Sequence, residues 1–329
     1  MSESNNQQAI SHHYVPKFYL RLFSTMKKKE YYIYTFDKYT MKNFRTNIEN
    51  VACENYFYDI IKGSPPSFYE QAFLAFEAKE SEFGRVCKKI KSLKDYSQLS
   101  GDEKGVFADS PEKFFSVLET EFSRVHKKII YSADLTQLSE YEKVLFALSV
   151  FHQYRRTKAQ RDNVENTIHR FIIEQIGKAK SAKEIETLAR LLYMKELPPY
   201  LHLKAMVSTM ENNVNAFLSM GWALYINETN LSYWTSDNPV AVENITDFDP
   251  YKECEIQKGC KIYFPLSPKI YLLIYDSSIY EYPSIVSDNN LQSVIDKNKL
   301  QVDNSVRHVF SRDILSLKNI QKYAEKHAG

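Results

Sequence analysis

Four stretches in the last third of the chain decide the fold class: GWALYI (221–226), LSYWTS (231–236), KIYFPLSP (261–268) and KIYLLIYD (269–276). Each is rich in β-branched and aromatic residues, which is typical of strands. Residues 306–311 show the two-residue alternation of a further strand. The region 221–312 is therefore expected to be β-rich.

The N-terminal end has a similar composition. Residues 31–37 (YYIYTFD) predict a strand, and 41–46 predict its hairpin partner. Residues 55–61 (NYFYDII) predict another strand. A short helix is expected to begin after Pro16, because proline suits the first helical position. Residues 1–11 are expected to form a disordered tail.

Between the two β-rich ends, residues 68–220 are mostly helical in pattern. Helices are predicted over 140–178, 183–195 and 200–219. The sequence thus predicts an α+β fold, in which a mixed or antiparallel sheet is built from both chain ends and a helical bundle is inserted. The expected parts are an N-terminal helix and strands (12–67), the bundle (68–220), a β-rich part that packs with 12–67 (221–312) and a C-terminal helix (313–329).

A duplicated segment lies inside the helical region. Residues 80–107 (ESEFGRVCKKIKSLKDYSQLSGDEKGVF) and 119–146 (ETEFSRVHKKIIYSADLTQLSEYEKVLF) are identical at more than half of their aligned positions, without a gap. Each copy contains the Ser-x-x-Glu pattern of a capping box. Both copies are expected to form the same helix–loop–helix unit, which adds one helical hairpin to the bundle.

Composition excludes several classes of function. Only 8 of the 329 residues are glycine, and the chain has no GxGxxG, GxxxxGK[ST] or GxSxG sequence. It therefore has no common nucleotide-cofactor motif and no serine-hydrolase elbow. The net charge of +2 does not predict a nucleic-acid binder by bulk charge, so any anion site has to be local.

The cysteines and the hydropathy bear on location. The 4 cysteines form no CxxC pair, which argues against a structural zinc site. No apolar run reaches the roughly 18 residues of a membrane span, and the polar N-terminus lacks the apolar core of a secretory signal. We expect a cytoplasmic protein with reduced thiols and no membrane partner.

The first candidate site is the segment His12-His13-Tyr14-Val15-Pro16. Two imidazoles beside a tyrosine suit acid–base chemistry or phosphate binding. They do not suit a metal, because adjacent side chains diverge. The alternative is an aromatic N-terminal plug that packs on the sheet.

The second candidate is His152-Gln153-Tyr154-Arg155-Arg156-Thr157. His152 and Arg155 continue the apolar stripe of Leu145 and Leu148, so they are expected to be buried. Burying a guanidinium without a partner is costly. Its anion is therefore either a carboxylate of this chain or a phosphate or carboxylate of a ligand.

The third candidate is the strand end Ser236-Asp237-Asn238, followed by Pro239. Polar groups at a strand end suit a site that faces a cleft. Asp237 would orient His12 or His13, or pair with Arg155. The alternative is an Asx-type turn before the proline. No (D/E)xK nuclease pattern follows Asp237 convincingly, and the chain has no HExxH. This lowers a metal-nuclease interpretation and leaves a divalent cation open.

Five segments in this order, HYVPKFYLRLF, YIYTFDK, HQYRRT, TSDNPV and FPLSP, resemble a family of mostly bacterial proteins, domain of unknown function 4238. The hallmark of that family is His-Tyr-Val-Pro, and the resemblance covers residues 12–312. It implies a shared fold and one shared site, but no reaction. Carried over to this chain, the site would comprise His13, Tyr14, Pro16, Arg155, Arg156, Ser236, Asp237 and Asn238.

The leading hypothesis is an enzyme, a nuclease or phosphodiesterase, that acts on nucleic acid or a nucleotide, for example in bacterial defence against phage. His13, Arg155 and Asp237 would be catalytic. The substrate would be bound by His12, Tyr14, His152, Arg156, Ser236 and Asn238. The alternative is a non-catalytic ligand-binding or interaction protein, in which these residues form a buried structural network. A shared site requires His13, Arg155 and Asp237 to converge.

Overall fold

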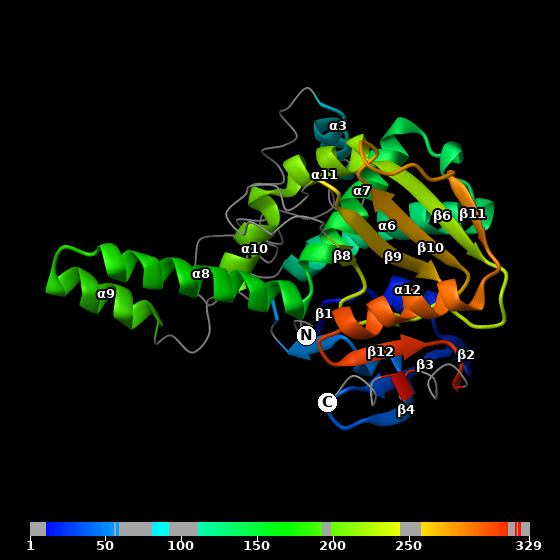
Figure 1. Ribbon diagram of the computed structural model, residues 1–329, viewed down its shortest axis with the longest axis horizontal. Helices are drawn as coiled ribbons and strands as arrows, with labels where there is room; N and C mark the ends of the chain where they lie inside the picture. The colour runs from blue at the N-terminus through cyan, green and yellow to red at the C-terminus, as the bar shows by residue number, and fades with distance from the viewer. Residues whose placement is uncertain are drawn as a thin grey trace, which may run out of the picture.

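A computed structural model describes residues 11–55, 57–58, 81–91, 111–192, 199–243, 258–314, 320 and 322–323. The chain has an α+β fold, with strands at both ends and helices in the middle, as the sequence predicts (Figure 1). The described helices are α1 (Lys17–Leu22), α3 (Glu82–Lys91), α6 (Pro111–Ser132), α7 (Glu140–Arg155), α8 (Lys158–Lys178), α9 (Ala182–Leu192), α10 (Pro199–Ser208), α11 (Met210–Ser219) and α12 (Leu291–Asn304).

The predicted sheet from both chain ends is present. Its strands run in the order β2–β3–β12–β7, and β4 also pairs with β3. The N-terminal strand β3 lies antiparallel to the C-terminal strand β12, with Phe36 opposite Val309. The bounds of these strands are β2 (Thr25–Lys27), β3 (Glu30–Asp37), β4 (Lys42–Asn47), β7 (Thr235–Ser236) and β12 (His308–Ser311).

The strands do not all join that sheet. A second five-stranded sheet, in the order β11–β6–β10–β9–β8, comes entirely from the C-terminal part. A third sheet pairs β1 (Ser11–His13) with β5 (Cys53–Asn55). The strands of the second sheet are β6 (Gly221–Asn227), β8 (Ala241–Glu243), β9 (Lys261–Ser267), β10 (Ile270–Tyr275) and β11 (Ile285–Asp288).

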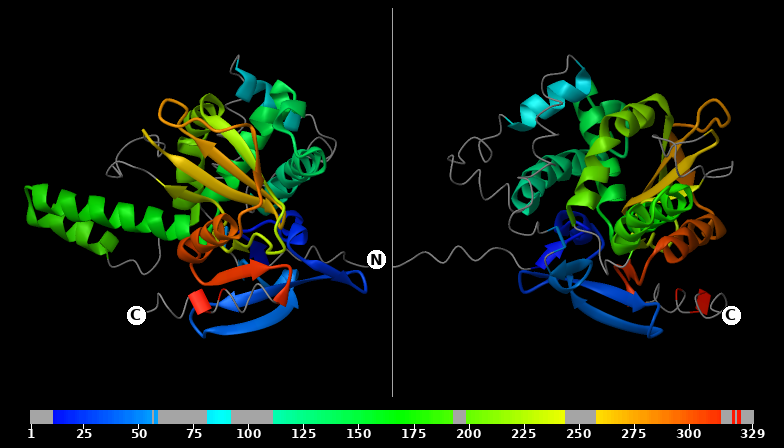
Figure 2. Two further views of the ribbon diagram at one scale, coloured as in Figure 1. Left: turned by 45° about the vertical axis from the view of Figure 1, so that its right-hand side comes forward. Right: turned by 90° about the vertical axis from the view of Figure 1, so that its left-hand side faces the viewer.

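The second sheet is covered on both faces, which explains why β10 is buried along its whole length. On one face, Leu272 and Ile274 belong to the same apolar core as α6 and α7. On the other face, Tyr271 packs with Val294 of α12. The sheet therefore lies between the helical middle and α12 (Figure 2).

Helix α7 is the centre of the bundle. Its residues from Val144 to Gln153 are all buried, as expected for a helix that is surrounded on every side. Helices α3, α6 and α11 pack against it. By contrast, the hairpin of α8 and α9 extends away from the rest of the described chain (Figure 1, Figure 2).

The duplicated segments can be compared over their first helix. Phe83 and Val86 of α3 are buried, and so are their counterparts Phe122 and Val125 of α6. The capping box predicted at Ser139 forms with Glu142. The matching box at residues 100–103 lies outside the described residues, so the full helix–loop–helix likeness stays a prediction.

Two predicted helices are broken. The helix expected over 140–178 is interrupted at Arg156 and Thr157, and Thr157 is extended. Tertiary hydrogen bonds account for the break: the Tyr58 hydroxyl donates to the Arg156 carbonyl oxygen (2.8 Å), and the Thr157 hydroxyl donates to Asn238 Oδ1 (2.9 Å). The helix expected over 200–219 is divided at Thr209 into α10 and α11.

Smaller differences occur at the strands and the ends. The helix after Pro16 and the β3–β4 hairpin are as predicted. Of the strand expected over 55–61, Asn55 is the last residue of β5, and Phe57 and Tyr58 lie in a turn; residues 56 and 59–61 lie outside the described residues. Helix α12 was not predicted, although Asn290 caps its first turn by accepting from Gln292 N (2.9 Å). Most of the predicted C-terminal helix and residues 1–10 of the predicted tail lie outside the described residues.

Candidate functional site

The His-Tyr-Val-Pro segment lies in the interior. β1 pairs with β5, and Tyr14 N donates to Ala52 O (3.0 Å). His12 is fully buried, and its Nδ1 accepts from Tyr58 N (3.1 Å) while its ring stacks on that of Tyr58. The hydrogen-bonding groups of this segment are thus used to attach it to residues 52–58.

The imidazole of His13 is a neutral donor. Its Nε2 donates to the carbonyl oxygen of Ile48 (3.3 Å). Burial, together with the nearby charge of Lys17, lowers the pKa of His13 to about 4. Burial also raises the pKa of Tyr14 well above its usual value. Both groups are therefore uncharged at neutral pH, and the carbonyl of Ile48 occupies the donor nitrogen of His13.

Arg156 is a fully buried cation. Its guanidinium donates to Glu119 Oε1 (2.6 Å) and to the carbonyl oxygen of His13 (2.6 Å). It also lies over the ring of Phe115, 5.1 Å from the centroid. The anion expected for a buried guanidinium is, at this position, a carboxylate of the chain itself. The charge-assisted bonds join the second motif to the first.

Asp237 anchors a turn. Its carboxylate accepts from the backbone N–H groups of Val306 (2.9 Å), Arg307 (2.8 Å) and His308 (2.8 Å). Burial raises the pKa of Asp237, and these three hydrogen bonds oppose that rise. The carboxylate therefore sets the entry into β12.

The side chains on either side of Asp237 are held by α12. Ser236 Oγ donates to Gln301 Oε1 (3.0 Å), and Asn238 Nδ2 donates to the carbonyl oxygen of Asn304 (3.0 Å). Asn238 Oδ1 also accepts from Thr157, which connects the third motif to the second. The FPLSP segment is joined to α1, the helix that follows the first motif, through Pro265, whose carbonyl oxygen accepts from the Tyr19 hydroxyl (2.6 Å).

We call this set of contacts the motif junction: residues 12–16, 156–157 and 236–238 with their partners. A cavity of only about 10 Å³ lies where the first two motifs meet, which has room for about one water molecule. His152 lies at this cavity and packs edge-on against Phe115 (centroids 4.8 Å apart), and burial lowers the pKa of His152 well below its usual value. This cavity has no room for a ligand larger than water.

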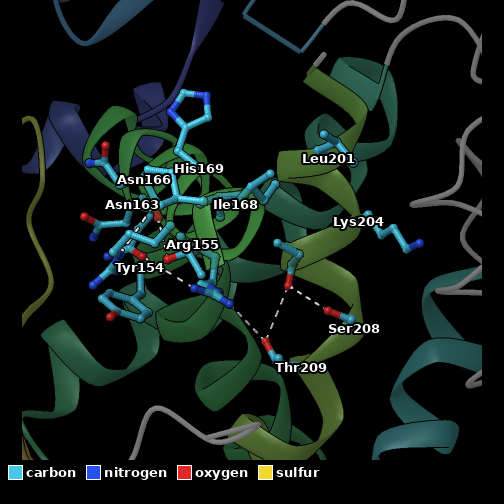
Figure 3. A pocket seen from close by; sticks show the side chains of 16 residues that line it. Tyr154, Arg155, Asn163, Asn166, Ile168, His169, Leu201, Lys204, Ser208 and Thr209 are labelled. Carbon is cyan, nitrogen blue, oxygen red and sulfur yellow. Dashed lines mark hydrogen bonds between the residues drawn. The ribbon is translucent and has the colours of Figure 1, made fainter. Parts of the chain in front are cut away.

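Arg155 is placed differently from its neighbour. It lines a groove of about 860 Å³ between α8 and α10, beside the end of α7 (Figure 3). We call it the Arg155 groove. Its lining among the described residues is Tyr154, Arg155, Gln160, Asn163, Val164, Asn166, Thr167, Ile168, His169, Arg170, Ile173, Leu201, Lys204, Ala205, Ser208 and Thr209.

Hydrogen bonds hold Arg155 in the groove. Its guanidinium donates to Thr209 Oγ1 (3.3 Å) and Gln160 Oε1 (3.5 Å). Its carbonyl oxygen accepts from His202 Nε2 (2.7 Å), which attaches α10 to the end of α7. Burial lowers the pKa of His202 to about 3, so this imidazole is neutral. The junction and His202 together determine where Arg155 lies.

The described lining of the groove favours an anion. It contains Arg155, Arg170 and Lys204 and has no aspartate or glutamate. Figure 3 shows the imidazole of His169 directed away from the centre and Lys204 at the outer side of α10. Among the described residues, no three His, Cys, Asp or Glu side chains form a group that would hold a metal ion. A divalent cation therefore stays a prediction.

A family comparison agrees with the order of the motifs. The model of a family of proteins of unknown function, DUF4238, matches residues 11–314. The chain is a member of the DUF4238 family. Its His-Tyr-Val-Pro hallmark, residues 13–16, begins at the last residue of β1 and belongs to the motif junction. Neither the curated proteins nor the solved structures contain a match to the chain.

In this member of the DUF4238 family, the candidate residues fall into two groups. The side chains or main chains of eight of them belong to the junction or line its cavity: His12, His13, Tyr14, His152, Arg156, Ser236, Asp237 and Asn238. Arg155 lies in the groove. The convergence of His13, Arg155 and Asp237 on one site stays a prediction. The hydrogen bonds given above join each of the three residues to different partners.

Sequence reasoning missed the partners of the junction. Glu119 lies inside the duplicated segment and looks like a surface residue of an amphipathic helix. Gln301 and Asn304 hold Ser236 and Asn238, and Asn298 accepts from Trp234 N (2.8 Å). These three residues recur at every third position of α12 and form a stripe of carboxamides on one face. Such a stripe could have indicated a polar helix face that binds backbone. None of the described helices is both long and apolar enough to span a membrane.

Proposed function

We propose that this protein binds a phosphate-containing ligand in the Arg155 groove, while the motif junction serves as its structural support. The observation that carries the proposal is a buried guanidinium that lines a groove of about 860 Å³, where it donates to Thr209 and Gln160. Guanidinium groups match the oxygens of phosphate, and a groove of this volume suits a small-molecule ligand.

The junction supports this function indirectly. Arg156 and Thr157 break the helix at the point where Arg155 turns toward the groove. The bonds of Arg156 to Glu119 and His13 therefore position the neighbouring side chain. A ligand site whose groups are preorganised in this way loses less entropy on binding.

Catalysis on that ligand is a separate proposal. The hydrogen bonds of His13 and Asp237 favour structural roles for both residues. A nuclease or phosphodiesterase activity, and a role in defence against phage, therefore stay predictions. They are tested by incubating the protein with single-stranded nucleic acid and with nucleotides and following product release.

Binding is tested first with inorganic pyrophosphate by calorimetry, using wild type and Arg155→Gln. We expect measurable binding by wild type and at least a tenfold weaker Kd in the variant, because one guanidinium–phosphate contact is removed. Lys143→Gln is the matched control, since Lys143 is a cation that lines a different pocket. Equal affinities for wild type and Arg155→Gln, or no binding by wild type, would overturn the proposal.

A further inference from the structure

We infer that the ligand of the Arg155 groove is a nucleotide, whose base is recognised by Asn163, Asn166 and Tyr154. This inference rests on the proposed function, because it places the phosphate at Arg155. It adds a second half to the site. That half lies on α8 and the end of α7, across the groove from Ser208 and Thr209 (Figure 3).

Two carboxamides carry the argument. Asn163 and Asn166 are three residues apart on α8, so their side chains point to the same side of the helix. Both residues are exposed and line the groove. In the part of the chain that the structure describes, neither side-chain amide makes a hydrogen bond, although the carbonyl oxygens of both residues accept one. Each amide therefore offers one acceptor and two donors to the groove.

Tyr154 adds an aromatic ring beside these amides. It is half-buried, lines the groove and is drawn on the same side as Asn163 and Asn166 (Figure 3). Proteins that read single nucleotides combine an aromatic surface for stacking with polar groups that bind the edge of the base. Amide side chains pair most readily with N6 and N7 of adenine. This donor set points to an adenine nucleotide.

The opposite wall suits the phosphate. The Arg155 guanidinium is directed toward Thr209, and Ser208 lies next to it on α10 (Figure 3). This arrangement differs from a glycine-rich phosphate loop, because side chains rather than backbone N–H groups meet the anion. It agrees with a chain that has only 8 glycines. A groove of about 860 Å³ is large enough for base, sugar and phosphate together.

The test compares three probes with wild-type protein by calorimetry, AMP, ribose 5-phosphate and inorganic phosphate, and adds CMP and UMP as nucleotides with other bases. We expect AMP to bind at least tenfold more tightly than ribose 5-phosphate, and more tightly than CMP or UMP. Asn163→Leu and Tyr154→Leu should each weaken AMP at least fivefold without changing the Kd for ribose 5-phosphate. Tyr154→Phe keeps the ring and should retain AMP binding.

Asn212→Leu is the matched control, because Asn212 is an exposed asparagine on another helix, α11. Circular dichroism spectra that match wild type establish that each variant is folded. Equal affinities for AMP and ribose 5-phosphate would overturn the nucleotide inference and leave the phosphate proposal standing. Failure of all three probes and of pyrophosphate to bind would overturn both.

Discussion

Arg155 and Arg156 are adjacent, yet they lie in opposite environments. Arg156 is fully buried, and its guanidinium binds Glu119 and the carbonyl oxygen of His13. Arg155 lines a groove about 860 Å³ in volume. Successive side chains of a helix point about 100° apart, so one of them can enter the core while the next faces a groove.

The contrast extends to the whole of both regions. The junction is a network of buried polar groups that bond to one another and to the backbone, whereas the groove is open and lined with donors. Buried polar groups need partners whether or not they are functional. Polar residues in a motif are therefore evidence for a buried hydrogen-bond network. Evidence for a ligand requires, in addition, an open groove or pocket beside them.

The largest expected effect is that of acid on two buried histidines: His13 of the junction, and His126 of α6, which lines the small cavity beside it. Burial lowers the pKa of His13 to about 4 and that of His126 to about 3, from an ordinary 6.5. Below pH 6.5 the unfolded chain thus binds more protons than the folded one. The free energy of unfolding should therefore have its full value above pH 6.5. As the pH falls toward 4, each of the two histidines should lower it by about 1.4 kcal/mol per pH unit.

Urea unfolding followed by circular dichroism between pH 7.5 and 4.5 measures this loss. His126→Gln removes one of the titrating groups and should flatten the pH dependence. A free energy of unfolding that does not change over this range would contradict the assignment of neutral, buried histidines.

The second prediction separates the two arginines. Arg156→Leu should lower the free energy of unfolding by about 4 kcal/mol, because it leaves Glu119 and the His13 carbonyl without their donor. Arg155→Leu should cost about 1 kcal/mol, since it removes two long hydrogen bonds at the edge of a groove. Urea titrations of both variants give the difference, and equal losses would break the comparison.

The third prediction concerns Asp237. Asp237→Asn replaces one acceptor oxygen by a donor, so at least one of the backbone N–H groups at 306–308 loses its partner. We expect a loss of about 3 kcal/mol in the free energy of unfolding. The exposed Asp303→Asn should change it by less than about 0.5 kcal/mol. A mild effect of Asp237→Asn on folding, together with loss of an activity, would restore a catalytic role.

The smallest effect comes from a pair of threonines. Thr157→Val removes the hydroxyl that donates to Asn238 and should cost about 1 kcal/mol of stability. Thr209→Val removes the acceptor of Arg155 and should leave stability within about 0.5 kcal/mol, while ligand binding weakens a few-fold. Thermal unfolding with and without pyrophosphate distinguishes the two. Weaker binding in Thr157→Val alone would reverse the assignment of the two regions.

Much of the fold could be predicted from local sequence. The helix after Pro16, the β3–β4 hairpin and strands β6, β9 and β10 follow from apolar periodicity and turn residues. These signals act over a few residues, so they are readable in one chain. The break at Arg156 was not predicted, because the groups that cause it come from distant segments. The division at Thr209 was not predicted either.

The candidate site shows the same division. The three motifs were recognised as polar segments in apolar surroundings. The second is joined to the first by the bond of Arg156 to His13 and to the third by the bond of Thr157 to Asn238. Their partners in α6 and α12 were missed, since a single sequence does not reveal which helix face meets which motif. The groove was missed for a related reason: it is a space between α8 and α10, and it is not a pattern in either.

The sequence by itself determined the α+β class, the location of the helical middle and the residues that had to be buried with partners. Periodicity and the cost of an unpaired buried charge are properties of short segments and of single side chains. Only the tertiary structure decided that Arg156 is neutralised by Glu119 whereas Arg155 faces a groove. The difference depends on how helices far apart in the chain pack together. Adjacent side chains of a helix point about 100° apart, so one arginine enters the core and the next faces the groove.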